Sequence, residues 1–541
     1  LVRDVCYAQT PRVARIARHR AAAEWLETRA GERLEDVADV LAHHYVTALE
    51  LARAAGQPTH GDDLRRNAIR CLALAADRAL GLDSARAEAN VRRALDIADD
   101  DDPERGRLLE RWAQALLRLG RHREAQTALE EARTRYESGH DPVGAARVEI
   151  AMSTVVWSLG ESGRRHALSA VALLEPLRVP ELVDAYAELA GEYLVNAQLP
   201  ESMDAAQRAL DLAAERELPE PARALGFLGS SRTISGDRRG LDDLRRALDL
   251  AKQRNQSRDA AVIFANLINA VHLYEGPRAA LEVTTEGIAF CVARGLTDMQ
   301  LFLGVVALRS RLDCGQIDQV LAGVPEISAS AVATGNGPVA LGVHSLLAHL
   351  ALHRGGGAAP NVDADELAAV NAEASSPFQV LARRSTAAQI YLVNGRLDDA
   401  RELLTQLATS PRTKRETLYA ILLPNLVRYA LMVDDVQVAH QMIVGIEPFA
   451  RLHTNALVAS KAQLAEADGR TDDALRLYAE AAERWRDFGN VPELAYALLG
   501  LGRCLRSTDP AAASSPLSEA RDLFADLGFE PALREVSALL D

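Results

Sequence analysis

Lysine is almost absent from this sequence: its 541 residues contain three, at Lys252, Lys414 and Lys461. None of them follows a glycine, so the chain has no phosphate-binding loop of the G-x-x-x-x-G-K-[ST] type. The motifs H-E-x-x-H, G-x-S-x-G and S-x-x-K are absent as well. We therefore predict that this chain has no catalytic residues and binds no cofactor. Whether the full-length protein is an enzyme stays open.

Cysteines are few, and they are spread too widely to form a C-x-x-C pair. They are Cys6, Cys71, Cys291, Cys314 and Cys504. This spacing argues against a disulfide framework or a zinc ribbon and fits a reducing cytoplasm. Acidic residues outnumber basic ones, 76 against 61, which gives a net charge of -15. A general nucleic-acid surface needs a basic stripe, so we expect no direct binding of nucleic acid.

The longest stretch without a charged residue runs over residues 327–353. Its middle contains Thr-Gly-Asn-Gly-Pro at 334–338, which would break any helix that spans a membrane. We therefore predict a helix, a loop and a second helix there, and no membrane span.

Alanine, leucine and arginine dominate the composition, which favours helices over strands. Residues 108–132 contain the clearest pattern. An apolar stripe at helical spacing (Leu109, Trp112, Ala113, Leu116) ends at Gly120, and a second stripe of Ala125, Leu129 and Ala132 follows. Two amphipathic helices of this kind cannot bury their stripes alone, so further hairpins must stack on each side.

The same pattern recurs along the chain, with a candidate hinge every 35 to 40 residues. The expected hinges are Gly81, Gly120, Gly160, a position near Ala197, Gly236, Gly276, Gly315, Gly355, Gly395, a position near Asp434, Gly469 and a position near Ser507. The sequence thus predicts an all-α solenoid of about twelve helical hairpins over residues 61–541, capped by a last helix at 531–540. If each repeat contacts only its neighbours, unfolding should be broad or multistep.

The hairpin at 108–132 resembles the tetratricopeptide repeat. Its bulky-small pair is Trp112-Ala113, its hinge glycine is Gly120, and its second-helix alanines are Ala125 and Ala132. This resemblance implies a right-handed superhelix whose first helices line a concave inner surface. The longer period is similar to that of the sensor superhelix of the maltose-regulon activator. Ala125 should press against the first helix, whereas Ala128 should point to another face.

Residues 1–60 differ from the repeats. A helix is expected from Pro11 to about Arg29, and a second one over 34–55. The segments LVRDVCY, RHRAAAEWLE and LAHHY resemble a junction in large bacterial signalling ATPases with many domains, where a winged helix gives way to tetratricopeptide repeats. Actinobacterial proteins that fuse a class III nucleotide cyclase or a transcription-factor domain to such an ATPase carry similar stretches.

Two pairs of histidines could suggest a metal site, but both have a plainer explanation. His349 and His353 are four apart on one helix face, with His344 nearby, and no third ligand is supplied locally. His43 and His44 are adjacent, so they should point to different sides of their helix. We therefore predict structural histidines at these positions and no metal site.

The candidate binding site is the concave groove. Asn266, Asn269 and His272 recur every three residues in an otherwise apolar helix, so we expect them to face a ligand. Asp184, Glu188 and Glu192 recur every four residues in an earlier repeat. Basic residues fall in the first helices of later repeats: Arg309, Arg384, Arg428 and Lys461. If these groups share a face, the groove runs from acidic to basic along its length.

These patterns indicate a sensor or docking module that binds a protein segment or a small-molecule effector and regulates an upstream signalling ATPase. Two alternatives stay open: the regulatory tail of a class III nucleotide cyclase, and a freestanding scaffold. The oligomeric state is open as well.

Overall fold

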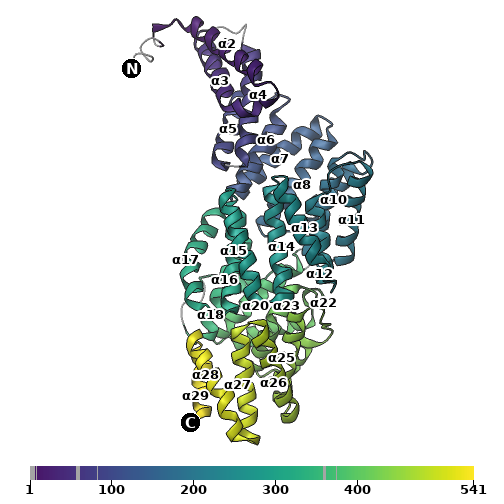
Figure 1. The fold of residues 1–541 in the computed structure, drawn as a ribbon, viewed down its shortest axis with the longest axis vertical. Helices are drawn as coiled ribbons and strands as arrows, with labels where there is room; N and C mark the ends of the chain where they lie inside the picture. The colour runs from purple at the N-terminus through teal and green to yellow at the C-terminus, as the bar shows by residue number, and fades with distance from the viewer. Residues whose placement is uncertain (1–6, 8, 57–60, 82, 357–360, 373–374) are drawn as a thin grey trace.

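The computed structural model describes residues 7, 9–56, 61–81, 83–356, 361–372 and 375–541. These residues form α-helices and short connections, with one 3-10 helix and no strand, so the predicted all-α solenoid is confirmed for them (Figure 1). The array is long and narrow. Its first helices lie at one end of the long axis and its last helices at the other (Figure 1).

The chain enters through α2 (Arg12–Ala30), the 3-10 helix η1 (Gly31–Val37) and α3 (Ala38–Ala54). Along the described residues, twelve hairpins then follow: α4 (Gly61–Leu80) with α5 (Ser84–Ile97), α6 (Arg105–Arg118) with α7 (His122–Ser138), α8 (Pro142–Ser158) with α9 (Arg164–Leu174), α10 (Glu181–Val195) with α11 (Leu199–Glu215), α12 (Ala222–Ile234) with α13 (Gly240–Gln253), α14 (Ser257–Glu275) with α15 (Pro277–Ala293), α16 (Thr297–Asp313) with α17 (Ile317–Thr334), α18 (Gly337–His353) with α19 (Ala364–Ala368), α20 (Pro377–Val393) with α21 (Leu397–Thr409), α23 (Thr417–Met432) with α24 (Val436–Ile443), α25 (Arg451–Ala467) with α26 (Thr471–Phe488), and α27 (Val491–Thr508) with α28 (Pro510–Leu527). The short α22 (Pro411–Lys414) precedes α23, and α29 (Glu530–Leu540) closes the array.

The predicted hinges are real backbone features. Ten of the twelve adopt a positive φ: Gly120, Gly160, Ala197, Gly236, Gly276, Gly315, Gly355, Gly395, Asp434 and Gly469. In this conformation the chain turns back while the carbonyls at the end of the first helix stay bonded, as where the amide of Arg121 donates to Leu116 at 2.9 Å. The local sequence pattern therefore located the turns correctly.

The predicted packing of the hairpin α6–α7 is also present. Leu109, Ala113 and Leu116 from α6 share one buried cluster with Ala125 and Leu129 from α7. Trp112 packs against this cluster and is partly buried, and its ring nitrogen donates a hydrogen bond to Glu88 at 3.2 Å.

The expectation for Ala128 is wrong. Ala128 is 2% exposed, Ala125 is 0% exposed, and both belong to the same cluster. Side chains of α8 such as Val148 and Met152 complete that cluster. A second helix inside an array has neighbours on both sides, so its apolar surface is wider than one hairpin requires.

The N-terminal helices differ slightly from the expectation. The helix predicted over 34–55 begins as the 3-10 segment η1, and the α-helix starts at Ala38. Helices α2 and α3 pack in one hydrophobic cluster with α4, through residues such as Ile16, Leu41 and Leu64. Cys6 lies outside the described residues.

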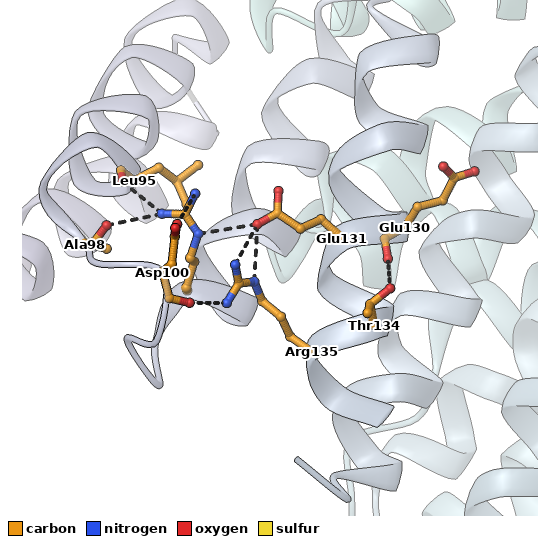
Figure 2. Close-up of polar contacts among 8 residues, drawn as sticks. Leu95, Ala98, Asp100, Glu130, Glu131, Thr134 and Arg135 are labelled. Carbon is orange, nitrogen blue, oxygen red and sulfur yellow. Dashed lines mark hydrogen bonds and ion pairs between the residues drawn. The ribbon is translucent and has the colours of Figure 1, made fainter. Parts of the chain in front are cut away.

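The acidic run at 99–102 forms the connection between α5 and α6, where arginines hold it (Figure 2). Arg105 donates to the carbonyls of Leu95 and Ala98, each at 3.2 Å, and so caps the end of α5. Glu131 accepts from both Arg105 and Arg135, and Arg135 also bonds the carbonyl of Asp100. The run therefore helps to fix the angle between two neighbouring hairpins.

Distant turns of the superhelix contact one another directly. Hinge glycines lie against residues 176 to 219 positions further along: Gly120 against Thr334, Gly160 against Gln379, Gly236 against Phe449, Gly276 against Phe488, Gly315 against Val491 and Gly355 against Pro531. Helix α14 also contacts α25, and α16 contacts α27. The expectation that each repeat contacts only its neighbours is therefore wrong, and with it the stated reason for broad unfolding. The superhelix winds tightly enough for one turn to rest on the next.

No helix in the described ranges combines the length and the apolar character that crossing a membrane requires.

Candidate functional site

A partly open chamber of about 270 Å³ lies between the stacked turns of the superhelix. First helices of five successive repeats form its wall, namely α8, α10, α12, α14 and α16. Its other side is formed by the next turn, through Ser376 and Phe378 at the start of α20 and Glu416 and Thr417 at the start of α23. A ligand in this chamber would contact both turns at once.

Aromatic side chains supply much of the apolar lining. Trp157, Phe227, Phe302 and Phe378 come from four different helices. The rings of Trp157 and Phe302 meet edge to face, with centroids 5.9 Å apart. Phe378 is 38% exposed, so part of its ring is accessible to a ligand.

The structure places Asn266 and Asn269 in this lining. Asn269 is exposed and Asn266 is half-buried. The side-chain nitrogen of Asn266 is shielded from water and has no hydrogen-bond partner among the described residues. An amide side chain offers one donor group and one acceptor, which matches a peptide group. The role of both residues in binding stays a prediction.

The expectation that His272 faces a ligand is wrong. His272 is 7% exposed and is absent from the chamber lining. Phe488 of the next turn covers it, with ring centroids 6.2 Å apart, and Asp313 lies 3.6 Å from Nε2. Burial lowers the pKa of His272, while the Asp313 carboxylate opposes that shift. The turn contact at Gly276 closes the inner surface at this point.

The acidic residues predicted for the groove gather at the chamber. Glu188 and Glu192 line it, and Asp184 lies one helical turn before Glu188. Glu188 pairs with Arg223 from α12 and accepts from Thr154 at 3.5 Å. Desolvation raises the pKa of Asp184, and the negative charge of Asp259 raises it further.

Glu192 is buried, at 5% exposure. One oxygen accepts from the Ser153 hydroxyl at 3.2 Å. The other oxygen finds no hydrogen-bond partner in the part of the chain that the structure describes. Burial and the neighbouring Glu188 raise the pKa of Glu192 to about 7, against the opposing influence of Ser153 and Arg223.

Glu416 is a site residue that the sequence did not reveal. It precedes α23 without capping it, and its Oε1 is buried with no hydrogen-bond partner across the described ranges. Burial raises the pKa of Glu416 to about 8, although Arg412 opposes the shift. Nothing in the local pattern marks Glu416, because it reaches the chamber only through the stacking of two turns.

Two of the four basic residues predicted for the groove are paired with carboxylates. Arg309 pairs with Asp313 at 3.4 Å, and Arg428 pairs with Glu493 at 3.1 Å. Burial lowers the pKa of Arg384, and Lys461 is exposed. Glu188 and Glu192 line the chamber, whereas these four basic residues do not. A groove that runs from acidic to basic stays a prediction.

The paired histidines of α18 belong to an aromatic cluster of the interior. The rings of His349 and His353 are 4.2 Å apart. His353 is hydrogen-bonded to Tyr496 at 2.6 Å and to Tyr429 at 3.2 Å, and it stacks on Phe529. Burial lowers the pKa of both imidazoles. At the other end of the array His19 bonds His44 at 2.9 Å, and its ring also lies 6.0 Å from that of His43.

No group of three metal-ligating side chains is found among the residues that the structure describes.

A second chamber, of about 390 Å³, lies near the C-terminus. Its charged groups pair with one another: Arg503 lies 2.7 Å from Glu466 and 2.8 Å from Glu535, and Arg428 pairs with Glu493. The chamber beside Asn266 differs because some of its polar atoms have no partner among the described residues. It is therefore the better candidate for a binding site.

Comparison with known proteins supports the repeat architecture. Residues 454–526, within α25–α28, match the family model described as tetratricopeptide repeat. No curated protein matches the chain.

Three solved structures are similar in outline. One is a Rap protein complexed with competence and sporulation factor, 14% identical, covering 74% of this chain and 98% of that one, with a TM-score of 0.44. The Cut9–Hcn1 hetero-tetramer of the APC/C is 13% identical over 99% and 97%, with a TM-score of 0.41. A signal transduction ATPase with numerous domains and a tetratricopeptide repeat sensor, from Pyrococcus horikoshii, is 10% identical over 92% and 74%, with a TM-score of 0.31. Identities and TM-scores this low transfer no function to the chain.

Proposed function

We propose that this chain is the sensor module of a larger signalling protein and that it binds a peptide segment of a protein partner in the chamber beside Asn266. The chamber carries the proposal, because it joins apolar rings to buried polar atoms that lack partners within the described ranges. A peptide supplies both kinds of group, namely apolar side chains for the rings and backbone amides for Asn266 and Asn269.

Occupancy of the chamber would be transmitted through the contact between turns. Phe378 and Glu416 belong to one turn, and Asn266 and Phe227 belong to the previous turn. A ligand that touches both turns stabilises the arrangement in which they are closed, because it binds that arrangement better than an open one. The superhelix would thus shorten or stiffen on binding.

Residues 1–60 would connect the sensor to its output. Their resemblance to the junction of signalling ATPases supports a winged helix and an ATPase upstream, in a cytoplasmic protein that regulates transcription or makes a cyclic nucleotide. The coding sequence upstream of Leu1 tests this part directly. Absence of ATPase motifs there would favour the freestanding scaffold.

Binding is tested with synthetic pools of nonapeptides and two variants. Asn269→Trp should fill the chamber and abolish peptide binding, since Asn269 is exposed and no core contact depends on it. Asn266→Ala combined with Asn269→Ala should weaken binding about tenfold, through the loss of hydrogen bonds to the peptide backbone. Fluorescence anisotropy of labelled pools gives the affinity, and circular dichroism confirms that each variant melts like the parent chain.

The matched control is Glu282→Trp, which places the same bulky side chain on an exposed position of α15 outside the chamber. It should bind peptides as the parent chain does. Peptide binding that survives Asn269→Trp would place the site elsewhere. A small molecule that Asn269→Trp displaces, with no peptide binding at all, would favour an effector sensor over a peptide sensor.

A further inference from the structure

We propose that the ligand of this chamber is cationic, and that Glu192 and Glu416 receive a guanidinium or ammonium group from it. This inference rests on the proposed function, since it needs the chamber to be a binding site. It goes further because it gives the charge and the chemical class of the ligand: a basic peptide segment with apolar neighbours.

The charges of the lining are the first argument. Three glutamates line the chamber, Glu188, Glu192 and Glu416, against two arginines, Arg223 and Arg258. Both arginines already have a carboxylate partner within this structure. Arg223 pairs with Glu188, and Arg258 lies 2.7 Å from Asp298. An anionic ligand would therefore find no free cation among the described lining residues.

The second argument is the set of atoms without partners. Glu192 Oε2 and Glu416 Oε1 are buried acceptors that lack a donor anywhere in the described ranges. A buried carboxylate oxygen without a donor is costly, and a charged donor satisfies it best. Each of these two carboxyls, which come from different turns, thus lacks a hydrogen-bond donor. A forked guanidinium or an ammonium group can provide one.

The chamber also contains unused donors, which argue for a peptide over a simple amine. Arg223 Nε and Asn266 Nδ2 are shielded from water and lack acceptors among the described residues. Backbone carbonyl oxygens of a peptide would satisfy them. A peptide that contains arginine or lysine supplies both groups. Its basic side chain can pair with the glutamates, and its backbone carbonyls can accept from these two donors.

Aromatic rings make the same site favourable for a cation. Trp157, Phe227, Phe302 and Phe378 offer ring faces and apolar surface for the aliphatic stem of a basic side chain. Phe227 already accommodates one cation, since the guanidinium of Arg223 lies 5.7 Å from its ring centre.

Proton release provides a signature of this mode of binding. Burial raises the pKa of Glu192 to about 7 and that of Glu416 to about 8, so at pH 7 a substantial fraction of each carboxyl is protonated in the free chain. The other charged groups facing them are Glu188 and Arg223 at Glu192, and Arg412 at Glu416. When an ammonium or guanidinium group binds, each carboxyl gives up its proton to water and forms an ion pair with the cation.

The test uses three pools of nonapeptides that differ at one fixed position, which is arginine, glutamine or glutamate among randomised apolar residues. The arginine pool should bind the full chain at least tenfold more tightly than the glutamine pool, and the glutamate pool more weakly still. Glu192→Gln with Glu416→Gln should remove the preference for arginine. Glu282→Gln, an exposed carboxyl on α15, is the matched control and should keep that preference.

Calorimetry of the unmodified chain gives a second measurement that needs no variant. At pH 7, binding of the arginine pool should be more exothermic in Tris than in phosphate, because Tris takes up the released protons with a large favourable enthalpy. Equal enthalpies in both buffers would overturn the proposal.

The outcomes separate this inference from the proposed function. If the glutamine or glutamate pool binds best and Asn269→Trp abolishes that binding, the chamber is a binding site but its ligand is not cationic. If the binding of every pool is unaffected by Asn269→Trp, the chamber is not the binding site and the proposed function itself is wrong.

Discussion

The side-chain amide of Gln379 donates a hydrogen bond of 2.5 Å to the backbone carbonyl of Gly160, although the two residues are 219 positions apart. Gly160 is the hinge between α8 and α9, and Gln379 lies in the first turn of α20. Phe378, the residue before Gln379, lines the candidate chamber. This hydrogen bond between the two superhelical turns therefore lies directly beside the candidate chamber. We expect a ligand in the chamber to strengthen the contact between the turns.

Replacing Gln379 with alanine tests this link. Gln379→Ala should lower the free energy of unfolding by about 1 kcal/mol, the usual net value of one hydrogen bond. It should also weaken ligand binding, since the two sides of the chamber lose a connection. Gln207→Ala is the control, because Gln207 is an exposed glutamine outside the chamber whose side-chain amide donates at 2.8 Å to Asp211 of its own helix, α11. Urea unfolding and peptide binding are measured for both. An equal loss of affinity in both variants would mean that the bond between Gln379 and Gly160 has no special link to the chamber.

Gly276 tests the cost of stacking the turns. A Cβ at this position would come within 2.3 Å of the carbonyl oxygen of Phe488, and φ is +101°. Gly276→Ala should therefore destabilise the chain by clearly more than about 1 kcal/mol. Gly395→Ala is the matched control, because it also has a positive φ but nothing within 4 Å of the new atom.

The difference between the two midpoints in urea then measures the contact between turns. It should be accompanied by a broader transition in Gly276→Ala, since separated turns unfold more independently. Identical behaviour of the two variants would mean that the contact contributes no stability.

Ala125 and Ala128 test the packing of a second helix. Both are buried in the cluster shared by α6, α7 and α8, so Ala125→Leu and Ala128→Leu should each cost about 1–3 kcal/mol through overpacking. Thr127→Leu, on the exposed side of the same helix, should change stability little. Thermal melts followed by circular dichroism compare the three variants. Tolerance of leucine at 128 would mean that α7 is buried on one side only.

The histidines of α18 should make the chain sensitive to acid. Burial holds the pKa of His349 and His353 below the value they have in the unfolded chain, so unfolded histidine binds protons first as pH falls. Stability is thus fully present above about pH 6.5 and is lost as pH falls below that value. The midpoint of urea unfolding should decrease between pH 7.5 and pH 5.

The double variant His349→Gln with His353→Gln isolates this contribution. Its unfolding midpoint should depend less on pH over the same range, whatever its stability at pH 7.5. His140→Gln, a single change at an exposed histidine, should keep the pH dependence of the parent chain. A double variant with the full dependence would show that other buried groups cause it.

The sequence alone determined the repeating unit. The period of the hinges, the apolar stripes of α6 and α7 and the capping helix α29 all depend on local patterns, because a helix and its turn are set by residues three or four apart. The same patterns singled out Asn266, Asn269, Glu188 and Glu192, all of which line the chamber.

Only the tertiary structure decided how the turns meet. The path of a solenoid is the sum of small rotations, one per repeat, and no local pattern fixes that sum. For this reason the sequence did not reveal that Phe488 covers His272, or that Glu416 and Phe378 complete a chamber begun two hundred residues earlier. Those contacts between distant turns build one partly open chamber from both turns, with carboxyl oxygens that lack hydrogen-bond partners among the described residues.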